Sequence, residues 1–287
     1  MNVCDIQTHG YPKRYGKKEQ RNRINMSVYF IADPHLNHYN IALHTQRIPW
    51  LYPNPNYDPN KRYHFKYNNP WAVNIKTHNE ALIENWNSWA QKGDLIYVVG
   101  DFAWKDHNHF LMALNGKKIL VLGNHDKASR EVYKNFTEVH EFGCRRKING
   151  HDISISHYAL RTWASSYHGS WSLYGHSHGR LPEFDNMLSF DVGVDVWGYG
   201  LVPFEVIEKK MQMKIDWMAQ NGKYSVDGEE RASGSYDRSP DKRVVDTRLK
   251  NKAIMKAMGY PINDAMWPET ILDMKSNESH EDFSEEK

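Results

Sequence analysis

Three uninterrupted apolar runs, each followed at once by polar residues, constrain the fold of this chain more than any other feature. The runs are Val28–Ala32, Leu95–Val99 and Lys118–Leu122. Continuous apolar runs of this length are typical of strands buried on both faces, as in parallel sheets. Between the first two runs, Thr77–Gln91 carries apolar side chains near helical spacing. This succession of strand, helix and strand predicts an α/β fold.

Each of these runs ends in residue types that bind metals, and two further clusters follow later in the chain. Side chains at the carboxyl ends of neighbouring strands converge in one crevice, so we expect the clusters to meet. Glycines begin three of the clusters, as expected where a sharp turn or a close backbone approach excludes a β-carbon. The five clusters are Asp33-Pro34-His35, Gly100-Asp101, Gly123-Asn124-His125-Asp126, His157 and Gly175-His176-Ser177-His178.

The mixture of carboxylate, amide and imidazole ligands suits borderline divalent cations. We expect two ions, with Mn²⁺ favoured over Fe²⁺, Zn²⁺ or Ni²⁺. Asp101 is the natural bridge between them, because each of its oxygens can bind one ion. Ions roughly 3.5–4 Å apart would hold a hydroxide between them and neutralise charge on a phosphoryl group. His125 would then protonate the leaving group, with Asp126 orienting its ring.

The ordered series of clusters resembles that of the calcineurin-like metallophosphoesterase superfamily over about residues 27–210. Within it, the chain looks most like small bacterial and phage phosphoesterases. The resemblance implies a four-layer α/β/β/α sandwich with two mixed β-sheets and a dinuclear centre at one edge. It supports His125 as the residue facing the leaving group. It assigns one metal to Asp33, His35, Asp101 and His178, and the other to Asp101, Asn124, His157 and His176.

The chain departs from the protein serine/threonine phosphatases of that superfamily at two positions. Gly100-Asp101 is followed by Phe102-Ala103-Trp104 rather than by Val-Asp-Arg-Gly. Asn124-His125 is followed by Asp126, where those phosphatases carry Glu. A phosphoprotein substrate is therefore disfavoured.

The remaining segments complete the predicted organisation. Residues 1–26 carry six basic and two acidic side chains, a balance of +4, and are predicted to be a flexible segment. The metallophosphoesterase domain is predicted at 27–220, with an aromatic-rich, irregular insertion at 44–75 that forms an ordered lid. A linker, a short helix and an acidic tail are predicted at 221–287.

Several side chains in loops are hypothesised to contact the substrate. Arg47 and Arg161 can match phosphate oxygens bidentately, and His38 follows His35 closely. The alternative is that such loop residues pack the insertion against the body. Asp191 and Asp195 are interpreted as structural, because aspartates beside a strand often cap turns.

Composition narrows the class of protein. The hydrophobic fraction of 40% and the charged fraction of 25% are ordinary for a globular protein. A net charge of +2 is too small for a nucleic-acid polycation. No apolar run approaches the roughly 18 residues that span a bilayer, and the N-terminus lacks a secretion signal. The two cysteines fit a reducing cytoplasm, so we expect a cytoplasmic protein with no membrane contact.

These observations predict a dinuclear metal-dependent phosphoester hydrolase. It would be a phosphodiesterase or a phosphatase acting on a small phosphorylated or nucleotide substrate. Two alternatives stay open: a nuclease acting on DNA or RNA, which would need a long basic groove, and a non-catalytic binding module that retains the fold. The oligomeric state is left undetermined by the sequence.

Overall fold

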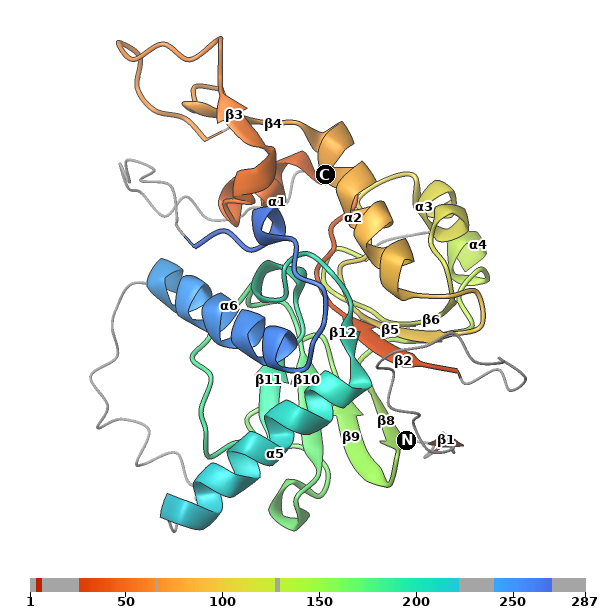
Figure 1. Ribbon diagram of the computed structural model, residues 1–287. Helices are drawn as coiled ribbons and strands as arrows, with labels where there is room; N and C mark the ends of the chain where they lie inside the picture. Colours follow the sequence, from red (N-terminus) through yellow and green to blue (C-terminus); the bar gives the residue numbers. More distant parts are fainter. Residues whose placement is uncertain (1–3, 7–25, 66, 127–129, 222–239, 270–287) are drawn as a thin grey trace.

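The protein has a mixed α/β fold built on two five-stranded sheets (Figure 1). The computed structural model describes residues 4–6, 26–65, 67–126, 130–221 and 240–269. Within these ranges a separate two-stranded sheet accompanies the two larger ones.

The first sheet contains the three strands that the apolar runs predicted. Its order is β12-β2-β5-β6-β7, and its neighbours are parallel except for β12, which runs antiparallel to β2 at one edge. The strands are β12 (Val202–Pro203), β2 (Val28–Ile31), β5 (Leu95–Val99), β6 (Lys117–Val121) and β7 (Glu138–His140). The predicted strands are confirmed to within one residue.

The second sheet mixes parallel and antiparallel neighbours in the order β1-β8-β9-β10-β11, with β8 and β9 antiparallel. Its strands are β1 (Cys4–Ile6), β8 (Cys144–Ile148), β9 (His151–Ile155), β10 (Trp171–Tyr174) and β11 (Ser189–Asp191). β7 and β8 follow each other in the chain but belong to different sheets. The N-terminal segment predicted to be flexible supplies β1, and most of the rest of it lies outside the described residues.

One apolar core contains side chains from both sheets, which therefore pack against each other. Phe30 and Tyr97 of the first sheet stack with ring centroids 4.9 Å apart, and Leu173 and Phe190 of the second sheet belong to the same buried cluster. Successive residues of a strand point to opposite faces. The alternate residues of β2, β5 and β6 accordingly form a second cluster, which α2 (Ile75–Trp89) and α3 (His107–Ala113) cover. Burial on both faces explains why the three runs are apolar apart from Lys118.

The remaining helices lie around this body, and α5 continues its core. The predicted helix at 77–91 corresponds to α2, and the short helix predicted within 221–287 corresponds to α6. The helices besides α2 and α3 are α1 (Tyr39–His44), α4 (Arg130–Tyr133), α5 (Phe204–Asn221) and α6 (Pro240–Ala257). In the part of the chain that the structure describes, no helix combines the length and the apolar character needed to cross a membrane.

Helix α6 packs on the body rather than forming an appendage. Val244, Met255 and the following Trp267 join the core between the sheets. Arg248 Nε donates to the carbonyl of Asp195 at 2.9 Å. The boundary predicted at residue 220 therefore falls between two helices that share one core. Most of the predicted linker and the acidic tail lie outside the described residues.

The insertion at 44–75 contains regular structure that its sequence did not reveal. A short helix, η1 (Ile48–Trp50), leads into β3 (Leu51–Pro53), which pairs antiparallel with β4 (Trp71–Val73). Strands of three residues are too short for a period of two to be recognised. The loop between them is tied by Asn68, whose side-chain amide donates to three backbone carbonyls. Figure 1 shows this hairpin projecting from the body beyond α1.

A buried ion-pair cluster holds the loop after β10 against α5. Glu183 lies 2.8 Å from Lys210 Nζ and 2.9 Å from Lys214 Nζ, and its side chain is 18% exposed. Burial alone would raise the pKa of Glu183, but the two ammonium groups lower it from its usual 4.5 to about 2. A carboxylate with a lowered pKa stabilises the fold above its unfolded pKa and loses that contribution as the pH falls.

We expect Glu183→Gln to lower the free energy of unfolding by about 3 kcal/mol at pH 7, because two buried lysines lose the carboxylate that neutralises them. The difference in unfolding free energy between the variant and the wild type should shrink by about half near pH 3. At that pH, Glu183 of the unfolded wild-type chain is already protonated. Urea unfolding at both pH values measures this. Glu80→Gln, at a solvent-exposed pair with Lys76, is the control and should change little. An equal deficit at pH 7 and pH 3 would contradict the ion-pair explanation.

Candidate metal centre

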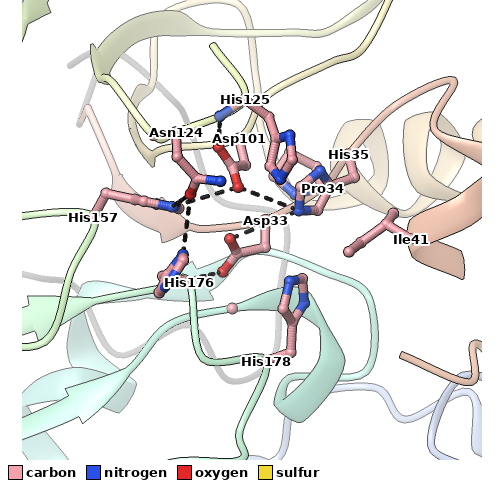
Figure 2. A network of polar contacts seen from close by, with 12 residues as sticks. Asp33, Pro34, His35, Ile41, Asp101, Asn124, His125, His157, His176 and His178 are labelled. Carbon is pink, nitrogen blue, oxygen red and sulfur yellow. Dashed lines mark hydrogen bonds and ion pairs between the residues drawn. The ribbon is translucent and has the colours of Figure 1, made fainter. Parts of the chain in front are cut away.

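Two groups of potential metal ligands lie next to each other where strands of both sheets end (Figure 2). Asp33, His35 and His178 form the first cluster, and Asp101, His157 and His176 form the second. Within each cluster the candidate ligand atoms lie within 4.8 Å of one another. The structure thus brings together side chains that are as much as 145 positions apart in the sequence.

Asp101 lies between the two clusters. Its Oδ2 is 3.4 Å from Nε2 of His35 and 3.4 Å from Nε2 of His157. Its Oδ1 accepts a hydrogen bond of 2.9 Å from the backbone N–H of His125. A β-carbon on Gly123 would lie 2.1 Å from that same Oδ1, so glycine is needed for the close approach of the two loops. The carboxylate therefore faces both groups of imidazoles, as a bridging ligand must.

Asn124 joins the second cluster, although it carries no charge. Its Oδ1 is 3.1 Å from Nε2 of His157 and 3.0 Å from Nδ1 of His176. The other ring nitrogen of His157, Nδ1, lies 2.9 Å from the carbonyl of Val99. When the ring is neutral and its Nδ1–H is donated to that carbonyl, Nε2 has a lone pair directed into the cluster. Gly100, with φ +90°, makes room for this ring.

Two buried atoms of the first cluster have no hydrogen-bond partner among the described residues: Oδ1 of Asp33 and Nε2 of His35. Unpartnered buried polar atoms are rare in folded proteins, because burying them costs free energy. Burial and neighbouring cationic groups hold the pKa of His35 well below its usual range, so its ring is neutral. A neutral imidazole with a free lone pair beside a carboxylate oxygen is what a divalent cation requires. The residues present therefore fit a metal ion.

His178 is held by the buried carboxylate of Asp195, one of the two aspartates interpreted as structural. Oδ2 of Asp195 lies 2.7 Å from Nδ1 of His178. Both oxygens of Asp195 also accept hydrogen bonds of 3.1 Å from the guanidinium of Arg47. Carboxylates placed in this way fix the orientation of a metal-binding imidazole. The motif Asp191–Asp195 was visible in the sequence, but nothing in it linked Asp195 to His178.

The hypothesis that Arg47 contacts a substrate is wrong in this structure. Its side chain is fully buried and donates to the carbonyls of Asp33 and Pro34 as well as to Asp195. Such an arginine positions the loop that carries the first cluster and has no donor directed to solvent. Its sequence context, an irregular insertion, gave no sign of this burial.

The proposed role of Asp126 also needs correction. Its carboxylate accepts hydrogen bonds from the backbone N–H groups of Asp101, Phe102 and Gly123, at 2.7, 2.9 and 2.8 Å. With both oxygens occupied, it ties the loop after β5 to the loop after β6 and does not orient the ring of His125.

The other predicted residues lie at different distances from the clusters. The ring of His125 is half-buried and lies 5.5 Å from that of His35. Nδ1 of His38 accepts the N–H of Ile41 and caps α1, while its ring lies 5.4 Å from that of His35. Arg161 is exposed in the loop after β9 and outside both clusters.

The backbone is strained where the ligands are attached. A positive φ costs a non-glycine residue roughly 1–2 kcal/mol, and such residues gather at functional sites. Positive φ angles occur at Asp33 (55°), His35 (47°), Asp101 (55°), His176 (68°) and His178 (48°). The fold therefore holds these side chains in place against a local conformational preference.

Burial and nearby charges shift the pKa values of candidate ligands in both clusters. Burial raises the pKa of Asp33 above its usual value. Burial lowers the pKa of His157, but its hydrogen bond to Asp101 and the nearby carboxylates outweigh this and raise it to about 9. Protons thus compete with cations for the same atoms, and metal binding should weaken as the pH falls.

Comparisons with known proteins give relatives without a named activity. No family model matches the chain. An uncharacterized protein of Methanocaldococcus jannaschii is 27% identical over 195 residues, which cover 64% of this chain and 91% of that protein. The gene 66 protein of Mycobacterium phage D29 is 24% identical over 215 residues, covering 64% and 94%. A solved structure, a protein of unknown function from Aquifex aeolicus, gives a TM-score of 0.45 at 24% identity and covers 64% and 99%.

Proposed function

We propose that the protein is a dinuclear metal-dependent phosphoester hydrolase of the calcineurin-like type, with the corresponding four-layer α/β/β/α sandwich. The observation that carries the proposal is the position of Asp101. Its Oδ2 lies 3.4 Å from Nε2 of His35 in the first cluster and 3.4 Å from Nε2 of His157 in the second. The packing of two mixed sheets on one core supports the fold.

The donor atoms of the two clusters suit two divalent ions, with Mn²⁺ favoured by the mixture of oxygen and nitrogen. When bound, such ions would polarise phosphoryl oxygens and make a water molecule more nucleophilic. The first ion would be held by Asp33, His35, Asp101 and His178, and the second by Asp101, Asn124, His157 and His176.

His125 is suited to deliver a proton to the departing oxygen. Its backbone N–H is fixed by Asp101, and its ring lies beside His35 at the border of the first cluster. Since it is half-buried, its ring can reach both substrate and solvent. A histidine within reach of the departing oxygen can serve as a general acid.

We expect His125→Gln to reduce kcat by about 10²–10³-fold on an alkyl phosphoester while the bound metal is retained. The loss should be much smaller on bis-p-nitrophenyl phosphate, because p-nitrophenolate departs without a proton. Steady-state kinetics on both substrates, with metal content measured in parallel, test this. A similar loss on the two substrates would argue against proton donation by His125.

The proposal itself is tested with purified protein and Mn²⁺, using bis-p-nitrophenyl phosphate, mononucleotides, cyclic nucleotides and short oligonucleotides. Hydrolysis together with about two bound ions per chain is the expected result. Two bound ions without turnover of any substrate would instead favour a binding module. Long DNA and RNA are added to the same series, and turnover restricted to these polymers, with steep salt dependence, would favour a nuclease.

A further inference from the structure

Beside the first metal cluster, the large aromatic side chain of Trp104 stays half exposed. Trp104 is 46% exposed, and its ring centroid lies 4.5 Å from that of His38 and 5.8 Å from that of His125. These two histidine rings lie 5.4 and 5.5 Å from the ring of His35. Adjoining rings therefore lead from the first cluster to the exposed indole.

The position of Trp104 relative to the clusters is fixed by the backbone. The backbone N–H of Trp104 donates to the carbonyl of Leu36 at 2.9 Å, and the neighbouring Ala103 forms a parallel β-bridge with Leu36. Beyond it, Asp106 accepts a hydrogen bond of 2.8 Å from the side chain of Asn37. The segments that follow Asp33 and Asp101 are thus joined, and a rigid aromatic ring binds a flat ligand at a low cost in entropy.

We propose that Trp104 binds the base of a nucleotide whose phosphate lies at the metal clusters, on the side of the leaving group. This inference rests on the proposed function. Trp104 contacts His125, the residue assigned to the leaving group, so the part of the substrate that departs is the part that reaches the indole. Every nucleobase has a π-face that can stack on an aromatic side chain. The substrate class is therefore a phosphoester whose leaving group is a nucleoside.

The test uses two esters with the same primary leaving oxygen, AMP and ribose 5-phosphate, which differ by the base. With Mn²⁺-loaded protein, we expect kcat/KM to be about tenfold higher for AMP, since stacking of one base is worth about 5- to 150-fold. Trp104→Ala should remove this advantage and change the value for ribose 5-phosphate by less than twofold. Trp104→Phe should keep most of it. Tyr52→Ala in β3, at a side chain of matched exposure, 45%, should change neither value.

Binding of adenosine and of ribose, followed by saturation-transfer NMR, gives a readout that needs no hydrolysis. We expect a signal for adenosine that Trp104→Ala weakens and Tyr52→Ala does not. If Trp104→Ala slows both esters equally, the indole only positions His125 and the inference is overturned. It is also overturned if neither ester is affected. If the native protein hydrolyses neither these esters nor bis-p-nitrophenyl phosphate but binds adenosine through Trp104, the base site stands and the hydrolase proposal falls.

Discussion

Replacement of Asp101 by Asn is expected to reduce the hydrolysis of bis-p-nitrophenyl phosphate by about a thousandfold or more. Asn keeps the shape of the side chain and the acceptor for the N–H of His125. It removes the negative charge that faces His35 and His157, so both candidate ions lose an anionic ligand. The thousandfold factor corresponds to the loss of several kcal/mol of charge stabilisation in the transition state, since about 1.4 kcal/mol changes the rate tenfold.

Turnover and metal content per chain are the two measurements for this variant. Asp152→Asn, which alters a partly exposed ion pair with Arg145, serves as the control and should retain both ions and activity. A thermal unfolding scan establishes that Asp101→Asn is folded. Undiminished turnover in folded Asp101→Asn protein would refute the bridging role and the chemistry built on it.

Replacement of Asp195 is expected to affect stability and metal affinity together. Asp195→Ala leaves the buried guanidinium of Arg47 without its carboxylate, which should cost about 3–5 kcal/mol of unfolding free energy. It also frees Nδ1 of His178 from its 2.7 Å contact, so the first cluster should bind Mn²⁺ roughly 10–100-fold more weakly. Asp195→Asn keeps an acceptor oxygen and should recover part of the metal affinity.

A loss of stability alone could explain weaker metal binding, so a matched variant is needed. Glu183→Gln lowers stability through a different buried ion pair and should bind Mn²⁺ with native affinity. Metal titrations of both variants at a temperature where each is folded make the comparison. Equal metal affinities in Asp195→Ala and Glu183→Gln would show that Asp195 has no positioning role.

The strands and the candidate ligands could be predicted because their signals are local. β5 is apolar at every position since both of its faces are buried, and its end coincides with Gly100 and Asp101. Gly123 directly precedes Asn124 and marks a close backbone approach, although the residue that approaches it, Asp101, was not visible from the sequence around it. Each of these signals lies within a few residues of the feature that it predicts.

The partners of Arg47 and Asp126 could not be predicted, because they are chosen by the tertiary fold. Arg47 pairs with a carboxylate 148 positions away, and an isolated arginine in an irregular segment looks the same whether it binds phosphate or is buried. Asp126 adjoins His125 in sequence, but its oxygens accept N–H groups from Asp101 and Phe102 in another loop. Neighbours in the sequence were therefore a poor guide to neighbours in space.

The contact between α6 and the segment that carries Asp195 has a consequence for synthesis on the ribosome. Arg248 holds the carbonyl of Asp195, and Asn251 holds that of Val196. When both sheets have emerged from the ribosome but α6 has not, the chain lacks these two restraints on the segment of Asp195, the residue that orients His178. Nascent protein should therefore acquire its full affinity for the first cation only after translation has passed α6.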